Sequence, residues 1–405
     1  MAGESPLNMM RADGRHIWNR SGAAAPAGGS RPRLWLIVGS IALVVGVAVG
    51  WCALWYYAAS TADRTLADWG AREAAAGRVY SCGSQEVSGF PFSIRVHCTQ
   101  VGAALNSTQP PLSLDAKDIT FTAPIYRPNY LSGELTGPLT VSPPGQKPIF
   151  AATWSSARMS LSGLPPNPDA VEVRIEQPHL DRGEGAGAAT LFAAADAGFD
   201  ARIISGSAGN DPVIDAVLHF AAATAPTAHP LLAQPLQGRI EVVLRGLKDL
   251  SAKPLAAQFR EIQAAGGNVE IKSFRIESAD AIVAGAGTLS LDAQGRLNGV
   301  VTVAVYGLEN IVPQLGIDKA INQELDRLGG TSGQSGQTLS ALDRLLPGLS
   351  GVVSAGANAS VVSDLKKMGQ PTEIDQKPAV ALPLRFSAGA VYFGMIRLGE
   401  VPALF

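Results

Sequence analysis

The feature that most constrains this chain is an uncharged run at residues 34–57, which almost all of the sequence follows. A helix over these 24 residues would be roughly 36 Å long, enough to cross a bilayer core of about 30 Å. A cleaved signal peptide is the alternative, because Tyr57-Ala58-Ala59-Ser60 resembles a weak cleavage site. The apolar stretch of a signal peptide is only about 7–15 residues long, so we expect a retained transmembrane helix.

The charges that flank this run predict its orientation. Five arginines precede it, with only Glu4 and Asp13 to balance them, whereas acidic and basic residues are balanced just after it. Positively charged flanks stay on the cytoplasmic side. Together with the bias toward Ala and Gly, this predicts a single-pass protein of the bacterial inner membrane, with a cytoplasmic N-terminus and the bulk of the chain in the periplasm. The expected parts are a disordered cytoplasmic tail (1–33), the transmembrane helix (34–57), a juxtamembrane helix (58–77) and a periplasmic β-rich domain (78–405).

Apolar and polar residues alternate with a period of two through much of the exported part. Residues 171–176 alternate without a fault, and comparable patterns recur at 214–220, 240–245, 297–306 and 380–395. A change of phase near Ser273 indicates a β-bulge. Such strands, joined by turns rich in the 44 glycines and 27 prolines, are typical of an antiparallel meander. The sequence therefore predicts a mainly β fold.

Two segments with a helical pattern interrupt the strands. One covers residues 247–264, where Pro254 suits the first turn of a helix, and the other covers residues 309–346. The simpler interpretation is that both helical insertions cover an apolar face or an unpaired edge of the sheet. The alternative is a mobile lid over a binding groove.

Two of the three cysteines, Cys82 and Cys98, lie in the exported part, whereas Cys52 lies within the uncharged run. In an oxidising compartment such a pair is expected to form a disulfide. A metal site or a redox pair is the alternative, but the spacing is not that of a CxxC motif and only His97 lies nearby.

The sequence offers little support for catalysis or cofactor binding. No histidine has the HExxH spacing or stands beside a zinc-type pair of cysteines, and no G-x-S-x-G elbow occurs. We therefore expect no enzyme activity, no cofactor and no metal, with a hydrolase of unrecognised site as the remaining enzymatic alternative. The net charge of −2 and the 16% of charged residues give no sign of a nucleic-acid partner.

The most distinctive local motif places two aromatic residues around a proline, ahead of the strand that ends in Cys98. Its members are Gly89, Phe90, Pro91 and Phe92. Gly and Pro favour a turn here, and the structural interpretation is that the two phenylalanines plug the start of the sheet. The alternative is a ligand contact or a docking point close to the membrane.

Several motifs together resemble a known family. They are the G-F-P-F motif between two cysteines, the turn at residues 291–299, and the closing segments 389–394 and 398–404. Over roughly residues 34–405 the chain resembles the proteobacterial "domain of unknown function 2125" family, which has no established activity and no catalytic residues to carry over. That family is distantly similar to AsmA-like envelope proteins, which are anchored in the inner membrane and fold as elongated curved β-sheets with an apolar groove. The resemblance implies an elongated curved antiparallel sheet and a role in lipid handling or envelope maintenance, by fold-level analogy.

We therefore expect a protein without enzyme activity whose partner is membrane lipid, held in an apolar groove, with envelope proteins as further candidate partners. The strand at 297–306 is more apolar on one side, so we expect this side to line the concave face of the sheet. The candidate lipid-facing residues on it are Leu297, Val301, Val303 and Val305. The alternative function is a scaffolding or interaction protein whose sheet is closed by its helices.

Overall fold

The computed structural model describes residues 31–106, 108, 110–163, 167–183, 187–251, 253–312, 357–393 and 396–405. The chain divides into two compact units, Met1–Leu54 and Trp55–Phe405. The expected N-terminal tail falls mostly on residues 1–30, outside the described residues.

Helix α1 (Arg31–Ala75) contains the uncharged run and continues through the expected juxtamembrane helix. By length and composition it is apolar enough to cross a membrane. Its large apolar side chains, among them Leu36, Val44 and Leu54, are exposed. The helix ends just before Gly77, whose positive φ of 79° suits a helix C-terminus.

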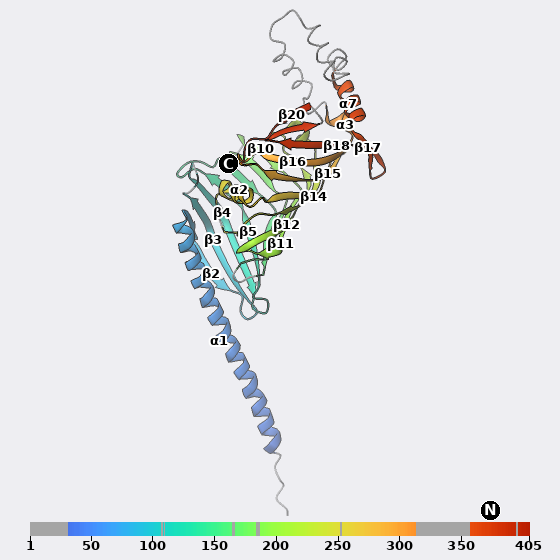
Figure 1. Ribbon diagram of the computed structural model, residues 1–405. Coiled ribbons are helices and arrows are strands. Elements are labelled where there is room, and N and C mark those ends of the chain that lie inside the picture. The colour runs from blue at the N-terminus through green and yellow to red at the C-terminus, as the bar shows by residue number, and fades with distance from the viewer. Residues whose placement is uncertain are drawn as a thin grey trace, which may run out of the picture. The chain divides into compact units, whose positions relative to one another are not determined.

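The rest of the described chain is dominated by β-strands (Figure 1). The strands of the first half are β1 (Arg78–Ser81), β2 (Ser84–Ser88), β3 (Ser93–Leu105), β4 (Leu112–Pro124), β5 (Tyr130–Ser142), β6 (Phe150–Thr153), β7 (Ser156–Ser162), β8 (Ala170–Glu176), β9 (His179–Arg182) and β10 (Ala189–Ala193). Those of the second half are β11 (Asp196–Ser207), β12 (Asn210–Ala223), β13 (Leu236–Leu244), β14 (Asn268–Glu277), β15 (Ile282–Leu291), β16 (Leu297–Tyr306), β17 (Gln370–Ile374), β18 (Lys377–Ser387), β19 (Ala390–Phe393) and β20 (Ile396–Glu400). The helical elements after α1 are η2 (Pro230–Ala233), α2 (Leu255–Ala264), α3 (Leu308–Ile311) and α7 (Ala357–Met368).

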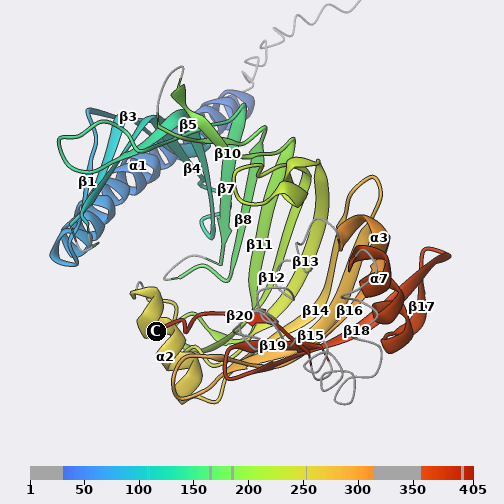
Figure 2. The ribbon, with the colours of Figure 1, turned by 90° about the horizontal axis from the view of Figure 1, so that it is seen from above.

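All of these strands belong to one antiparallel sheet. Strands β1 and β2 both pair with β3, and the sheet continues through β4, β5, β7, β8, β11, β12, β13, β14, β15, β16 and β18. The short strands β6, β9 and β10 extend one side of this series, and β17 and β19 both pair with β18. Figure 2 shows that the sheet curves along this series. In the described residues β20 pairs only with β19, so the sheet stays open. The predicted mainly β, curved antiparallel fold is confirmed.

Two local features of the strands follow the sequence pattern. The register between β13 and β14 shifts between Glu241 and Val242, and that between β14 and β15 shifts between Ile271 and Phe274. These shifts are the bulge that the change of phase near Ser273 predicts. The hairpin between β15 and β16 is closed by a turn in which Asp292 N donates a hydrogen bond to Arg296 O at 2.9 Å.

The structure describes a helix in the first helical insertion and only the start of the second. Helix α2 begins directly after Pro254, as its sequence indicates, and buries Ile262. Only the start of the second insertion is described, as the short helix α3, and the remainder lies outside the described residues. Helix α7 has no counterpart in the expected elements, because its sequence is weakly apolar and follows a Gly-rich stretch.

The main buried cluster lies at one end of the sheet. It joins α3 and the following Val312 to β16, β18 and β19, and Val362 and Leu365 of α7 pack against it. The buried members of the cluster are Val305, Leu308, Val312, Val380, Leu382 and Phe393. Helices α3 and α7 therefore cover this end of the sheet. Whether the rest of the second insertion does so stays a prediction, because it lies outside the described residues.

At the other end of the sheet, a disulfide joins Cys82 to Cys98 of β3, with 5.7 Å between the Cα atoms. The expected pairing is thus present, and Cys52 is free and exposed. The bond fixes the segment between β1 and β2 against the strand with which both pair.

Candidate functional site

The register of the strands sorts the side chains of the sheet into one apolar and one polar face. Residues directly opposite in an antiparallel pair point to the same side, and successive residues alternate. Val173 is opposite Phe199, Phe199 is opposite Leu218, and Leu218 is opposite Ile240. Each pair joins two apolar side chains, so the alternation seen in single strands adds up to a continuous surface.

We call this surface the apolar face. Its large members in the central strands include Met159, Leu161, Val171, Val173, Ile175, Phe199, Ile203, Ile214, Leu218, Phe220, Ile240, Val242, Leu244, Val269, Ile271, Phe274 and Ile276. The same register continues through Val283 and Val303 to Leu382. It therefore reaches the strands that α3 and α7 cover.

The apolar face is unevenly covered. The buried clusters of the described residues gather on β15 to β19 and their neighbours. On the central strands, by contrast, Phe199 is 40% exposed and Leu218 is 41% exposed. Two large apolar side chains that face each other across a strand pair and remain exposed to this extent form a surface that can bind an apolar molecule.

The four candidate lipid-facing residues do share one face of β16, as predicted. Their side chains are more buried than expected for residues that contact lipid, however: Val301 is 6% exposed and Val305 is 7% exposed. Val305 belongs to the main buried cluster, and Val303 packs against it. The structure therefore gives these valines a packing role, and the exposed part of the same face lies on β11 and β12. Alternation at residues 214–220 gave a sequence signal for Leu218, whereas no local signal distinguished Phe199.

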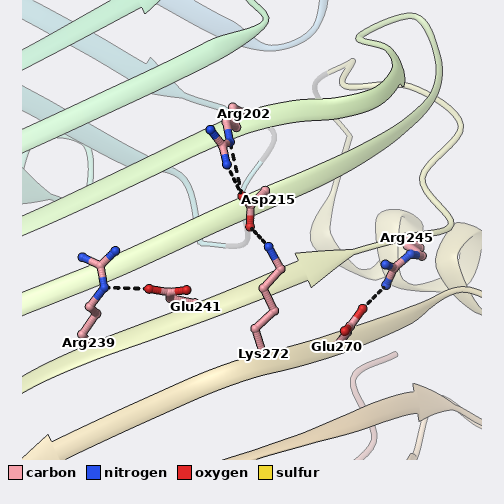
Figure 3. Close-up of polar contacts among 7 residues, drawn as sticks. All are labelled: Arg202, Asp215, Arg239, Glu241, Arg245, Glu270 and Lys272. Carbon is pink, nitrogen blue, oxygen red and sulfur yellow. Dashed lines mark hydrogen bonds and ion pairs between the residues drawn. The ribbon is translucent and has the colours of Figure 1, made fainter.

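The opposite, polar face carries ion pairs within and between the central strands (Figure 3). Asp215 of β12 accepts hydrogen bonds from Arg202 of β11 at 2.9 Å and from Lys272 of β14 at 2.8 Å. The residue is only 8% exposed. The hydrogen bond from Lys272, with that from Arg202, lowers the pKa of the Asp215 carboxyl below its usual value against the effect of burial. Further pairs join Arg239 to Glu241 and Arg245 to Glu270.

A cavity of about 420 Å³ opens beside these groups, lined mainly by polar-face side chains of β7, β8, β11, β12 and β13. Its charged lining residues are Glu172, Asp200, Arg202, Asp215 and Arg239. The carboxylates of this set are paired with basic residues, as in the contact of Arg174 with Asp200 at 2.9 Å. The arrangement stabilises the polar face by mutual neutralisation.

The described residues contain no group of three His, Cys, Asp or Glu side chains placed to hold a metal ion. The histidines in the strands contact neighbouring hydroxyl or carboxyl groups instead: His97 Nδ1 lies 2.9 Å from Thr120 Oγ1, His219 Nε2 lies 3.3 Å from Asp196, and His179 Nε2 lies 3.1 Å from Asp181. The expected lack of a cofactor or a catalytic centre stays a prediction.

The G-F-P-F motif forms the turn between β2 and β3 but does not plug the sheet. Gly89 adopts a positive φ of 102°, a backbone conformation that favours glycine. Phe90 packs edge-on against Trp55, with 5.6 Å between the ring centroids, and both Phe90 and Phe92 are exposed. The plug interpretation is wrong for these side chains, because both remain exposed.

The part of the chain that matches a known family begins at the first residue of the second compact unit, Trp55. Residues 55–402 match the model of a family described as "Uncharacterized protein conserved in bacteria (DUF2125)". The chain belongs to this family. The match covers the whole sheet of this DUF2125 protein and begins at Trp55, within the last turn of the uncharged run. Neither a curated protein nor a solved structure matches the chain. The distant similarity to AsmA-like proteins stays an expectation.

Proposed function

We propose that this DUF2125 protein is anchored in the bacterial inner membrane by α1 and holds lipid acyl chains against its apolar face in the periplasm. The observation that carries the proposal is the exposure of Phe199 and Leu218 at the centre of a continuous apolar face. Monomeric proteins rarely expose contiguous apolar surface of this kind unless it binds something.

The chemistry of the two faces supports a lipid as the bound molecule. Burying apolar surface gains about 25 cal/mol per Å², and an acyl chain offers apolar surface without polar groups that would need partners. Such groups would find few partners on the apolar face, because the ion pairs of the central strands lie on the polar face. An apolar helix in the same chain brings this surface to a source of lipid.

The charge pattern and the disulfide support a periplasmic location for the sheet. Arginines crowd the N-terminal side of the uncharged run, which favours a cytoplasmic N-terminus and export of the residues after it. A disulfide between Cys82 and Cys98 fits an oxidising compartment such as the periplasm. A role in envelope maintenance without enzyme activity is consistent with both.

The proposal is tested by photo-crosslinking in cells. Benzoylphenylalanine at the position of Phe199 or Leu218 should capture lipid. Val300 of β16 is the matched control, because it is also apolar and exposed but lies on the opposite side of its strand from Val301. Native mass spectrometry of the full chain purified in detergent should find lipid bound, and a Leu218→Glu change should remove it with only a small decrease in the melting temperature.

The outcomes separate the alternatives. Capture of an envelope protein at Phe199 and Leu218, in place of lipid, would support the scaffolding function. Equal lipid capture at Val300 would show that the apolar face has no special role.

A further inference from the structure

Two neighbouring turns at one end of the sheet carry exposed aromatic side chains. Phe90 and Phe92 lie in the turn between β2 and β3, and Tyr126 lies in the turn between β4 and β5. Ile125 N donates a hydrogen bond to Phe92 O at 3.0 Å, so the two turns are joined. Phe92 is 65% exposed and Tyr126 is 71% exposed. We call Phe90, Phe92 and Tyr126 the aromatic tip.

The aromatic tip is fixed to the end of the uncharged run of α1. Trp55 Nε1 donates a hydrogen bond to the backbone carbonyl of Ser93 at 2.9 Å, and its ring contacts that of Phe90. Trp55 is followed by Tyr56 and Tyr57, both exposed, and the first charged residue after them is Asp63. If the uncharged run spans the bilayer, Trp55 lies where the span meets water, and the tip lies at the same level.

The residue types of the aromatic tip suit the interface between membrane and water. Tyrosine and tryptophan gather at membrane–water interfaces, where the ring is buried among lipid and the polar group stays hydrated, and phenylalanine contributes an apolar ring to surfaces that lie in the interface. Arg127 follows Tyr126 and is exposed, with its guanidinium 5.2 Å from the centroid of the Tyr130 ring. An exposed guanidinium that directly follows Tyr126 in the chain suits the phosphate groups of lipid headgroups.

We infer that the aromatic tip is a docking surface for the interface of the bilayer that α1 crosses, with Phe92 and Tyr126 inserted among the lipid headgroups. This surface is separate from the apolar face, and it gives the sheet a second attachment to the membrane besides α1. It rests on the anchoring role of α1 and not on acyl-chain binding by β11 and β12.

The test uses the full chain reconstituted in vesicles of phosphatidylethanolamine and phosphatidylglycerol. Benzoylphenylalanine replaces Phe92 or Tyr126, since these exposed aromatic residues tolerate an aromatic substitute. Met368, an exposed apolar residue at the end of α7, is the negative control, and Val44 in the uncharged run is the positive control. Irradiation followed by intact-protein mass spectrometry should show lipid adducts at Phe92, Tyr126 and Val44, and none above background at Met368.

A second variant tests whether the two turns act together. With the crosslinker at Phe92, a Tyr126→Asp change should reduce the yield of lipid adduct, because it places a charge at the interface, whereas Met368→Asp should not. Both changes are at exposed positions and should leave the melting temperature unchanged.

The inference is overturned if Val44 captures lipid while Phe92 and Tyr126 match the Met368 background, since the anchor then inserts and the tip does not. Crosslinks between two copies of the chain at Phe92, in place of lipid adducts, would also overturn it and would identify the tip as a contact between copies. Either result would leave lipid capture at Phe199 and Leu218 as a separate question.

Discussion

Phe199 of β11 and Leu218 of β12 lie directly opposite each other on the apolar face, and each keeps about two-fifths of its surface exposed. Farther along the same face, Val303 of β16 lies opposite Leu382 of β18, and there α3 and α7 provide cover. The same alternation of side chains thus leads to two environments, an exposed surface at the centre and a packed core at one end.

This difference predicts unequal costs for two equivalent truncations. Leu382→Ala should lower the free energy of unfolding by about 2–5 kcal/mol, because it leaves a cavity in a packed cluster. Leu218→Ala should lower it by about 1 kcal/mol or less, because its side chain is already in contact with solvent. Denaturant unfolding of the full chain in detergent measures both. Equal losses would mean that the centre of the apolar face is covered as well as its end.

The disulfide should contribute to stability through the loop that it closes. Cys82 and Cys98 are 16 positions apart. Closing a loop of this size raises the free energy of the unfolded chain by about 3 kcal/mol, because it restricts the conformations of that chain. Replacing both with Ser should lower the free energy of unfolding by about 2–4 kcal/mol. Cys52→Ser serves as the control and should have little effect. Peptide mapping without reductant should find Cys82 linked to Cys98, and free thiols at both positions in periplasmic protein would contradict the expectation.

Asp215 should make stability depend on pH in the acid range. Its pKa is lowered in the folded protein, chiefly by the hydrogen bond from Lys272, so the folded state binds the proton less readily than the unfolded chain. The stabilisation is therefore complete above the unfolded pKa of about 3.9 and is lost as the pH falls through the folded value.

An Asp215→Asn variant should be less stable at neutral pH by about 1–3 kcal/mol, because it removes hydrogen bonds between charged groups. Its stability should then fall less steeply than that of the original protein below about pH 4. Arg239→Ala removes an exposed ion pair and should change stability by only about 1 kcal/mol or less. Parallel pH curves for Asp215→Asn and the unchanged chain would show that Asp215 does not supply this dependence.

The proposed topology predicts the activity of fusions to alkaline phosphatase, which requires export. A fusion after residue 70 should be active and a fusion at residue 25 inactive, because arginine precedes the uncharged run in excess. Whole-cell phosphatase assays with immunoblots for expression would measure this. The reverse pattern would place the sheet in the cytoplasm and remove the basis for a periplasmic lipid-binding role.

Elements whose signal is local can be predicted from the residues alone. An uncharged run specifies an apolar helix, alternation specifies the two faces of each strand, and a change of phase near Ser273 specifies a bulge. The two partners of the disulfide could also be predicted, because only two cysteines lie outside the uncharged run. Each of these features depends on residues close in the chain or on a choice among very few partners.

Which parts of the apolar face are covered depends on contacts between segments that are distant in the chain. Alternation directs Val305 and Leu218 to the same face, but it carries no information on whether another layer packs there. Val305 is buried because Leu308, Val312 and α7 contact its cluster, whereas Leu218 receives no comparable cover among the described residues. The exposure of Phe92 likewise depends on the absence of a covering segment among the described residues. Burial is a property of contacts between distant segments, so the location of the exposed surface could not be derived from local pattern.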